Sequence, residues 1–248
     1  TRGDRPAVRP EQVAGIGLSG QMHGLVLTAP DGTPARPAML HLDSRATADL
    51  RAYRELPGAV LDRLANPLSP TMAGPMLLWA ARHEPEAYHA ARWALQPKDW
   101  LRLRLTGAAG SEQSDASATL LYDLPGDRWD LDCVERLGLD GALLPPLLPA
   151  GTSPAGELTP EAAALLGLAA GTAVVAGGGD TAVAAVGSGL VRTSDVMVTV
   201  GTGGQVVTPL DTLPPDTLAG RRERGTHVYR TALPSGCIPP IALASHAR

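Results

Sequence analysis

The sequence predicts an α/β fold with a mixed β-sheet, and three observations support this prediction. Short apolar runs that suit buried strands alternate with segments whose apolar residues recur at helical spacing. The opening strands are joined by short turns such as Pro30-Asp31-Gly32-Thr33-Pro34, which favours antiparallel pairing there. Apolar residues make up 44% of the 248 residues and aromatic residues only 3%. We therefore expect a sizeable core built from leucine, valine, alanine and isoleucine.

The apolar runs that predict strands cover residues 13–19, 24–28, 37–41, 172–176, 197–200, 205–208 and 227–231. The first three runs follow one another closely, so we expect them to form a β-meander. Residues 177–179 are three consecutive glycines, which predict a tight turn. The chain's last residues, from Cys237 onwards, show no clear periodicity.

Five segments predict helices, each with its own boundary signal. The first starts at Asp43 or Ser44 and runs to about Leu56. The second covers 77–91 with an interruption at Pro85, and the third covers 99–105. The fourth runs from Thr159-Pro160-Glu161 to Gly167, and the fifth covers 181–186. No internal repeat accompanies them.

Charge and cysteine usage exclude several classes of function. The formal net charge is −4 and the basic residues are dispersed, so the chain lacks the one-sided basic surface of nucleic-acid-binding proteins. The uncharged run Ala162–Gly179 is long enough to span a membrane, but its glycines divide it into a helix, a turn and a strand. Cys133 and Cys237 are too far apart in the chain for a disulfide framework or metal motif. We expect a cytoplasmic protein that binds neither nucleic acid nor membranes.

Asp180 is the sharpest catalytic candidate. It follows a predicted buried strand and three glycines, and it stands where a helix begins. Ligands of α/β proteins gather at the carboxyl ends of strands, and a carboxylate there can act as a general base. Aspartate is equally common as a plain helix N-cap. The local sequence leaves both interpretations open.

Three further segments could contact a ligand. The amide, thioether and imidazole of Gln21-Met22-His23 could hold a polyol, although a buried histidine at a strand end is the commoner case. Gly201-Thr202-Gly203-Gly204 could present backbone N–H groups to phosphate, although an ordinary glycine hairpin is favoured on local grounds. Asp43 and Arg45 could touch a substrate, but pairing with each other is favoured.

Taken in order, these segments resemble the FGGY carbohydrate kinases. Gly17-Leu-Ser-Gly-Gln-Met-His-Gly24 is similar to the segment that holds the sugar in xylulokinases of this family. Four further segments resemble later motifs of the family: the run from Ala94 to Gly107, the block Ser114-Asp115-Ala116-Ser117, the block around Asp180 and the glycines 201–204. Each motif is weak alone, but their shared order and spacing are specific.

The resemblance implies a ribonuclease-H-like fold of the actin-like ATPase type, with ATP and sugar in a cleft between two domains. Residues 1–190 would form an incomplete N-terminal, sugar-binding domain. Residues 191–248 would form only the first strands of the C-terminal domain. We expect such unpaired strand edges to allow a homodimer.

The resemblance also implies roles for single residues. Asp180 would deprotonate the hydroxyl of D-xylulose that attacks the γ-phosphate of ATP, giving D-xylulose 5-phosphate. The residues expected to contact the sugar are Gln21, Met22, His23, Asp180 and Thr181. Gly201, Thr202 and Gly203 would approach the ATP phosphates, and Mg²⁺ would bridge phosphate oxygens.

Departures from the family pattern leave alternatives open. No D-x-G-T hairpin of the family type precedes Gly17, and the adenosine-binding region is not found, so we expect these residues alone to be inactive. Thr181 stands where xylulokinases often have asparagine, and Met76 stands where a lysine is frequent. A kinase for ribulose, gluconate or glycerol, or a non-catalytic truncated sugar-binding fragment, are the alternatives.

Overall fold

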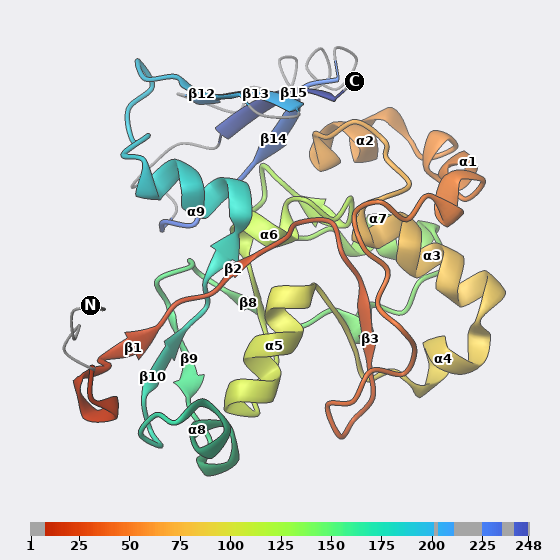
Figure 1. Ribbon diagram of the computed structural model, residues 1–248. Helices are drawn as coiled ribbons and strands as arrows, with labels where there is room; N and C mark the ends of the chain where they lie inside the picture. The colour runs from red at the N-terminus through yellow and green to blue at the C-terminus, as the bar shows by residue number, and fades with distance from the viewer. Residues whose placement is uncertain (1–7, 201–202, 211–224, 235–240, 248) are drawn as a thin grey trace.

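The computed structural model describes residues 8–200, 203–210, 225–234 and 241–247. Four of the described strands form one sheet. Figure 1 shows this sheet above helix α9, with a larger part below it that contains most of the helices. The α-helices in the described part are α1 (Leu50–Arg54), α2 (Gly58–Leu64), α3 (Ala73–His83), α4 (Pro85–Ala90), α5 (Pro97–Thr106), α6 (Gln113–Ala116), α7 (Leu131–Arg136), α8 (Pro160–Leu166) and α9 (Asp180–Gly187).

The mixed sheet predicted from the sequence is present. Strand β10 (Ala173–Val175) pairs in parallel with β1 (Gly15–Ile16) and antiparallel with β9 (Pro154–Glu157). Strand β11 (Gly178–Gly179) pairs in parallel with β2 (Ser19–Gly20). The first predicted strand and the strand before Asp180 therefore run side by side, each interrupted once. This pairing brings Gln21 next to Asp180 at the carboxyl ends of two parallel strands.

The predicted β-meander is wrong in its first member. Residues 13–20 pair with the distant strands β10 and β11 rather than with the neighbouring strand β3 (Val26–Thr28). Strand β3 pairs antiparallel with β4 (Trp93–Leu95), a strand that the sequence analysis missed. The second hairpin exists only as isolated bridges, Leu25 to Met39 and Thr28 to Pro34. Closeness along the chain did not predict which strands pair, because pairing depends on which faces of the strands can be buried together.

The helix predictions hold with adjusted boundaries. Proline 85 divides the predicted helix 77–91, since α3 ends at His83 and α4 begins at Pro85. The predicted helix 44–56 is a short 3-10 turn, Arg45–Thr47, followed by α1. Helix α8 begins with Thr159 as its N-cap, and Gly167 ends it with a φ of +66°. Both boundary residues of α8 are those predicted.

The main apolar core lies between β3 and the helices α2, α3 and α7. Leucine dominates it, as expected, but Met39, Met72 and Met76 are also completely or almost completely buried there. The unbranched methionine side chain fills irregular gaps, which a chain without phenylalanine needs. Met76, at a position where the resembling family often has lysine, is thus a core residue.

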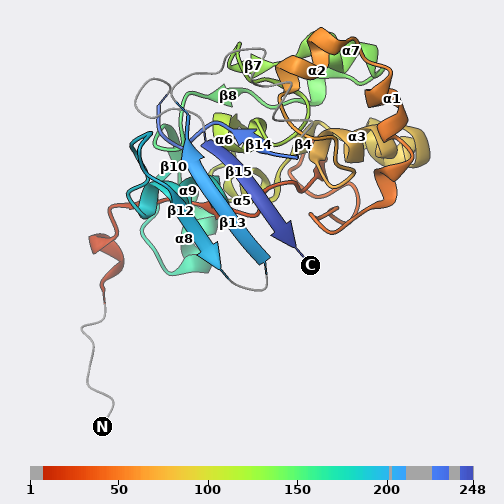
Figure 2. The same cartoon turned by 90° about the horizontal axis from the view of Figure 1, so that it is seen from above.

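The upper sheet has the antiparallel order β12 (Met197–Val200), β13 (Gly203–Pro209), β15 (Ile241–Ala247) and β14 (His227–Tyr229). Figure 2 shows it from above, with β13 and β15 side by side. The sequence predicted all of these strands except β15, whose residues lack period-two alternation. The remaining short strands are β5 (Ser111–Glu112), β6 (Tyr122–Asp123), β7 (Arg128–Trp129) and β8 (Leu147–Leu148).

Strand β14 is held against the lower part of the molecule by side-chain amides. The Asn66 amide donates to Val228 O at 2.9 Å, and Asn66 Oδ1 accepts from Val228 N at 2.8 Å. Gln113 Nε2 donates to Thr231 O at 2.9 Å. These buried amides fix the segment that carries His227 and Tyr229 relative to α6 and to Asn66, which follows α2.

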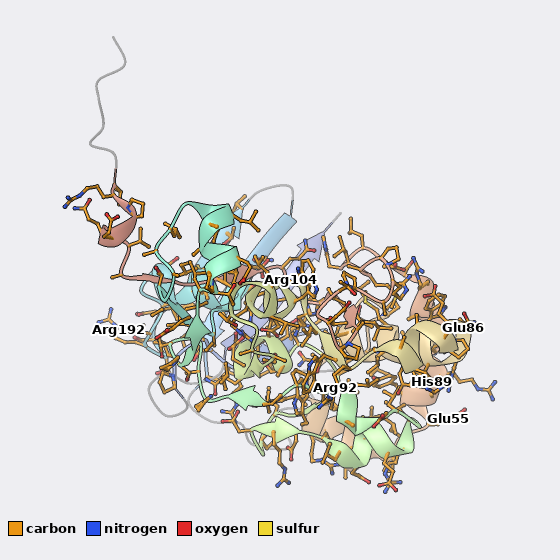
Figure 3. The ribbon with its side chains drawn as sticks, turned by 90° about the horizontal axis from the view of Figure 1, so that it is seen from below. Glu55, Glu86, His89, Arg92, Arg104 and Arg192 are labelled. Carbon is orange, nitrogen blue, oxygen red and sulfur yellow. The ribbon has the colours of Figure 1, made fainter. Side chains whose placement is uncertain are left out.

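Three exposed arginines of the described residues lie far from one another on the surface. Figure 3 shows Arg92, Arg104 and Arg192 on separate parts of the molecule. Within the described residues, no helix combines the length and the apolar character needed to cross a membrane.

Candidate functional site

One cavity, of about 360 Å³, collects all five residues that the sequence analysis assigned to the sugar. Most of its lining residues follow β2, begin α9 or belong to strand β14, elements that are labelled in Figure 1. Its lining consists of Gln21, Met22, His23, His41, Asp180, Thr181, Gln205, His227 and Tyr229. Residues far apart in the sequence therefore meet in a single polar hollow.

Asp180 is the first residue of α9, and Gly179 occupies the N-cap position. The N-cap interpretation of Asp180 is therefore wrong, because Asp180 stands one residue after the N-cap. Its Oδ1 instead accepts from the backbone nitrogen of Thr181 at 2.7 Å. The carboxylate is exposed and lines the cavity at the N-terminal end of α9. An ionised carboxylate at this place can accept a proton from a bound ligand.

The three glycines before Asp180 are required by contacts within the chain. Gly177 has a φ of +75°, and a Cβ atom there would lie 2.2 Å from Leu18 O. A Cβ on Gly178 would lie 2.8 Å from Val183 Cγ1, and one on Gly179 would lie 2.8 Å from Met22 Cγ. Gly178 and Gly179 are strand residues in β11, so the predicted tight turn is limited to Gly177.

A buried charged cluster lies directly behind these glycines. Lys98, the chain's only lysine, places Nζ 2.6 Å from Asp99 Oδ1, 3.3 Å from Asp115 Oδ2 and 3.6 Å from Glu112 Oε1. Arg102 Nη1 pairs with Asp99 Oδ1 at 3.0 Å. All five side chains are at most 1% exposed. Their contacts give two of the family-like segments, 94–107 and 114–117, a structural role.

The electrostatics of the cluster follow from burial and proximity. Burial opposes the charge of Lys98, but the carboxylates of Asp99, Asp115 and Glu112 outweigh it and raise the pKa of this lysine. Burial raises the pKa of Asp115 well above its ordinary value, and Lys98 offsets this only in part. Removing one member would leave its partners charged and unpaired in the interior.

Ser114 connects this cluster to the cavity. The Glu112 carboxylate accepts from Ser114 N at 2.8 Å, from Asp115 N at 2.9 Å and from the Ser114 hydroxyl at 2.8 Å. The Ser114 oxygen in turn accepts from Gly179 N at 3.1 Å. The residue that precedes Asp180 is thus fixed by a hydrogen-bond chain that begins at Glu112.

His23 has an unusual backbone and two partners. Its φ is +70°, in the left-handed region that non-glycine residues rarely adopt. Its Nδ1 lies 3.1 Å from Ala118 O, and its Nε2 lies 3.3 Å from the Tyr229 hydroxyl. The sequence-based expectation of a hydrogen-bonded histidine at a strand end is confirmed, and the same ring lines the cavity.

Two of the histidines that line the cavity, His23 and His227, are held in their neutral form by burial. Burial lowers the pKa of His23, and the nearby Asp180 charge only partly offsets this. Burial, followed by repulsion from His23, lowers the pKa of His227 to about 4. The ring of His227 stacks on that of Tyr229, with centroids 5.6 Å apart and an angle of 21° between the ring planes. These two imidazoles are therefore neutral near pH 7, as suits an uncharged polyol.

Of the segment 41–45, His41 lines the cavity, whereas Asp43 and Arg45 lie outside its lining. Arg45 Nε pairs with Asp43 Oδ1 at 2.8 Å, which confirms the predicted structural pair. The Arg45 guanidinium also lies over the Trp79 ring at 4.8 Å. His41, which the sequence analysis did not assign to the site, lines the cavity instead.

Sequence reasoning also missed Gln205, His227 and Tyr229. Residues 227–231 were predicted as a strand, and alternation along it places His227 and Tyr229 on one face. Two polar aromatic side chains on one face of a short strand were an available signal. Gly201 and Thr202 lie outside the described residues, and Gly203 begins β13, which pairs antiparallel with β12 as in a hairpin. The phosphate-binding role of these three residues stays a prediction.

Comparison with known proteins gives consistent matches. Residues 3–187 match the model of the N-terminal domain of the FGGY family of carbohydrate kinases. The chain is 35% identical over 201 residues to xylulose kinase of Bacillus subtilis, covering 81% of this chain and 40% of that protein. It is 37% identical over 195 residues to xylulose kinase of Staphylococcus epidermidis, covering 79% of this chain and 38% of that protein.

Structure comparison agrees with the sequence matches. The crystal structure of xylulose kinase from Rhodospirillum rubrum superimposes with a TM-score of 0.81 at 26% identity, covering 94% of this chain and 46% of that one. This likeness confirms the predicted actin-like ATPase fold. The chain spans about two fifths of the length of the curated relatives that it matches. Because the family model matches residues 3–187, the chain belongs to the FGGY family of carbohydrate kinases.

Proposed function

We propose that this chain is the sugar-binding part of a kinase that transfers the γ-phosphoryl group of ATP to D-xylulose, giving D-xylulose 5-phosphate and ADP. The observation that carries the proposal is the meeting of Gln21, Met22, His23, Asp180 and Thr181 in one cavity. Two relatives more than 30% identical to the chain are xylulose kinases, which favours this sugar.

The chemistry of the cavity suits a polyol. The Gln21 amide and the Thr181 hydroxyl can each donate and accept hydrogen bonds, as sugar hydroxyls do. Met22, 4% exposed, offers a soft apolar contact to the carbon chain. Asp180 then accepts the proton of the hydroxyl that attacks the γ-phosphorus, while the bond from that phosphorus to the β,γ-bridging oxygen of ATP breaks.

ATP and Mg²⁺ are part of the proposal. We assign Gly201, Thr202 and Gly203 to the ATP phosphates. Among the described residues, no group of three or more histidine, cysteine or acidic side chains could hold a metal ion. Of the described residues that line the cavity, Asp180 alone carries a carboxylate. This arrangement fits Mg²⁺, which is usually held by one or two carboxylates together with substrate phosphates and water. Bound Mg²⁺ would neutralise the charge of the transferred phosphoryl group.

The division into domains is also proposed. Residues 1–190 would form the sugar-binding N-terminal domain, in line with the family match to residues 3–187. Residues 191–248 would begin the second domain. On this division Gln205, His227 and Tyr229 reach the sugar cavity from the second domain.

Isothermal titration calorimetry with D-xylulose, D-ribulose, D-gluconate and glycerol tests the substrate. We expect D-xylulose to bind most tightly. If D-ribulose, D-gluconate or glycerol binds more tightly, the assignment of D-xylulose as the substrate is wrong. If none of the four binds, the proposed sugar site is refuted. A coupled ADP-release assay tests the separate expectation that these residues alone are inactive. Turnover of about 1 per second or faster would overturn that expectation.

A further inference from the structure

Both ring nitrogens of His23 are engaged within the chain, and their partners fix the position of its proton. Nδ1 lies 3.1 Å from the carbonyl oxygen of Ala118. A carbonyl only accepts hydrogen bonds, so Nδ1 must carry the proton. Nε2 of the neutral ring is then an acceptor, and the Tyr229 hydroxyl, 3.3 Å away, must donate to it.

The surroundings keep both groups in these states. Burial lowers the pKa of His23, which favours the neutral ring. Burial, followed by the negative charge of Asp180, raises the pKa of Tyr229, so its hydroxyl keeps its proton. The backbone of His23 lies in the left-handed region that non-glycine residues rarely adopt, which suits a ring held in a required place.

We propose that Tyr229 is a specificity-determining residue of this site, whose oxygen accepts a hydrogen bond from a hydroxyl of the bound polyol. Its single proton is committed to His23, so only lone pairs remain for the ligand. Tyr229 is 1% exposed, yet it lines the cavity together with Asp180, a second group that only accepts when ionised. The pair therefore selects a ligand with two hydroxyl donors. It disfavours a carbonyl or a missing hydroxyl opposite Tyr229, because the acceptor would then be left unpaired.

This inference rests on the proposed sugar site, and calorimetry tests it with Tyr229→Phe. The probes are D-xylulose and its monodeoxy analogues, each lacking one hydroxyl. We expect Tyr229→Phe to weaken D-xylulose binding about three- to tenfold, the worth of one neutral hydrogen bond. The analogue that lacks the hydroxyl facing Tyr229 should bind the unaltered protein weakly. Its affinity should not fall further in Tyr229→Phe, because the hydrogen bond is already missing. Tyr53→Phe is the control, since Tyr53 lies in the main apolar core away from the cavity, and it should leave every affinity unchanged.

A second readout needs no sugar. Nitrogen-15 spectra of the histidine rings should show His23 with a protonated Nδ1 and a bare Nε2. In Tyr229→Phe the pKa of His23 should rise, because a donor to its neutral form is lost while Ala118, Asp180, His41 and His227 remain around the ring. Tyr53→Phe should not move it. A protonated Nε2 in the unaltered protein would overturn the inference.

The two proposals fail in different ways. If the unaltered protein binds no polyol, the proposed function fails, and the assigned role of Tyr229 fails with it. If D-xylulose binds equally well to Tyr229→Phe, or if every monodeoxy analogue loses the same factor in the variant, only the role of Tyr229 is refuted.

Discussion

The hydroxyl oxygen of Ser114 lies 3.1 Å from the backbone nitrogen of Gly179, the N-cap of α9. This contact joins the buried charged cluster to the residue that precedes Asp180. Ser114 itself is completely buried, and its proton is donated to Glu112. The orientation of the catalytic candidate therefore depends on residues that do not line the cavity.

Replacing Ser114 with alanine should destabilise the protein by about 1–3 kcal/mol, because the buried N–H of Gly179 loses its acceptor. It should also weaken D-xylulose binding, since the start of α9 is no longer fixed. Denaturant unfolding and calorimetry measure the two effects. Ser188→Ala, at the exposed C-terminal end of α9, is the matched control and should stay within about 0.5 kcal/mol. Equal stability of the two variants would contradict the positioning role.

Replacing Asp180 with asparagine should separate binding from chemistry. The asparagine carbonyl can still accept from Thr181 N and from a hydroxyl of the ligand, so the local geometry should be kept. The affinity for D-xylulose should change by less than about threefold. In a version extended at both ends to the length of the relatives, turnover should fall by about 10²–10⁴, the usual contribution of a general base. Near-normal turnover in that variant would reject the assigned role of Asp180.

Stability should fall with decreasing pH because of His227. Its folded-state pKa is about 4, below the ordinary imidazole value of 6.5, so the unfolded chain binds more protons between these values. The contribution of His227 is complete above pH 6.5 and is lost as the pH falls towards 4, by at most about 3 kcal/mol. Urea unfolding across this range measures it. His227→Gln should flatten the profile, whereas His89→Gln, on the distant helix α4, should leave its slope unchanged.

Replacing Asn66 with alanine should loosen strand β14. The variant leaves the buried N–H and C=O of Val228 without their partner, at a cost of about 2–3 kcal/mol. We expect faster hydrogen exchange at Val228 and Tyr229, and weaker binding of D-xylulose. Amides in the middle of α3 provide the internal reference. Uniform acceleration over both elements would indicate global destabilisation instead of a local anchor.

Several local features were determined by the sequence alone. The boundaries of α8 follow from Thr159, Pro160 and Gly167, because caps act within a single turn. Proline 85 separates α3 from α4 for the same local reason. Gln21, Met22, His23, Asp180 and Thr181 were assigned to the sugar from motif order; they line one cavity, and their chemical roles stay predictions.

Only the tertiary structure decided how these pieces meet. The pairing of β2 with β11, the buried cluster around Lys98, and the arrival of His227 and Tyr229 above His23 all join residues distant in the chain. Such contacts depend on which surfaces can be buried together, and a one-dimensional pattern does not encode that choice directly. The sequence thus determined which residues could form a sugar site. The packing of the chain decided that Ser114 positions the start of α9, and that Tyr229 donates to His23.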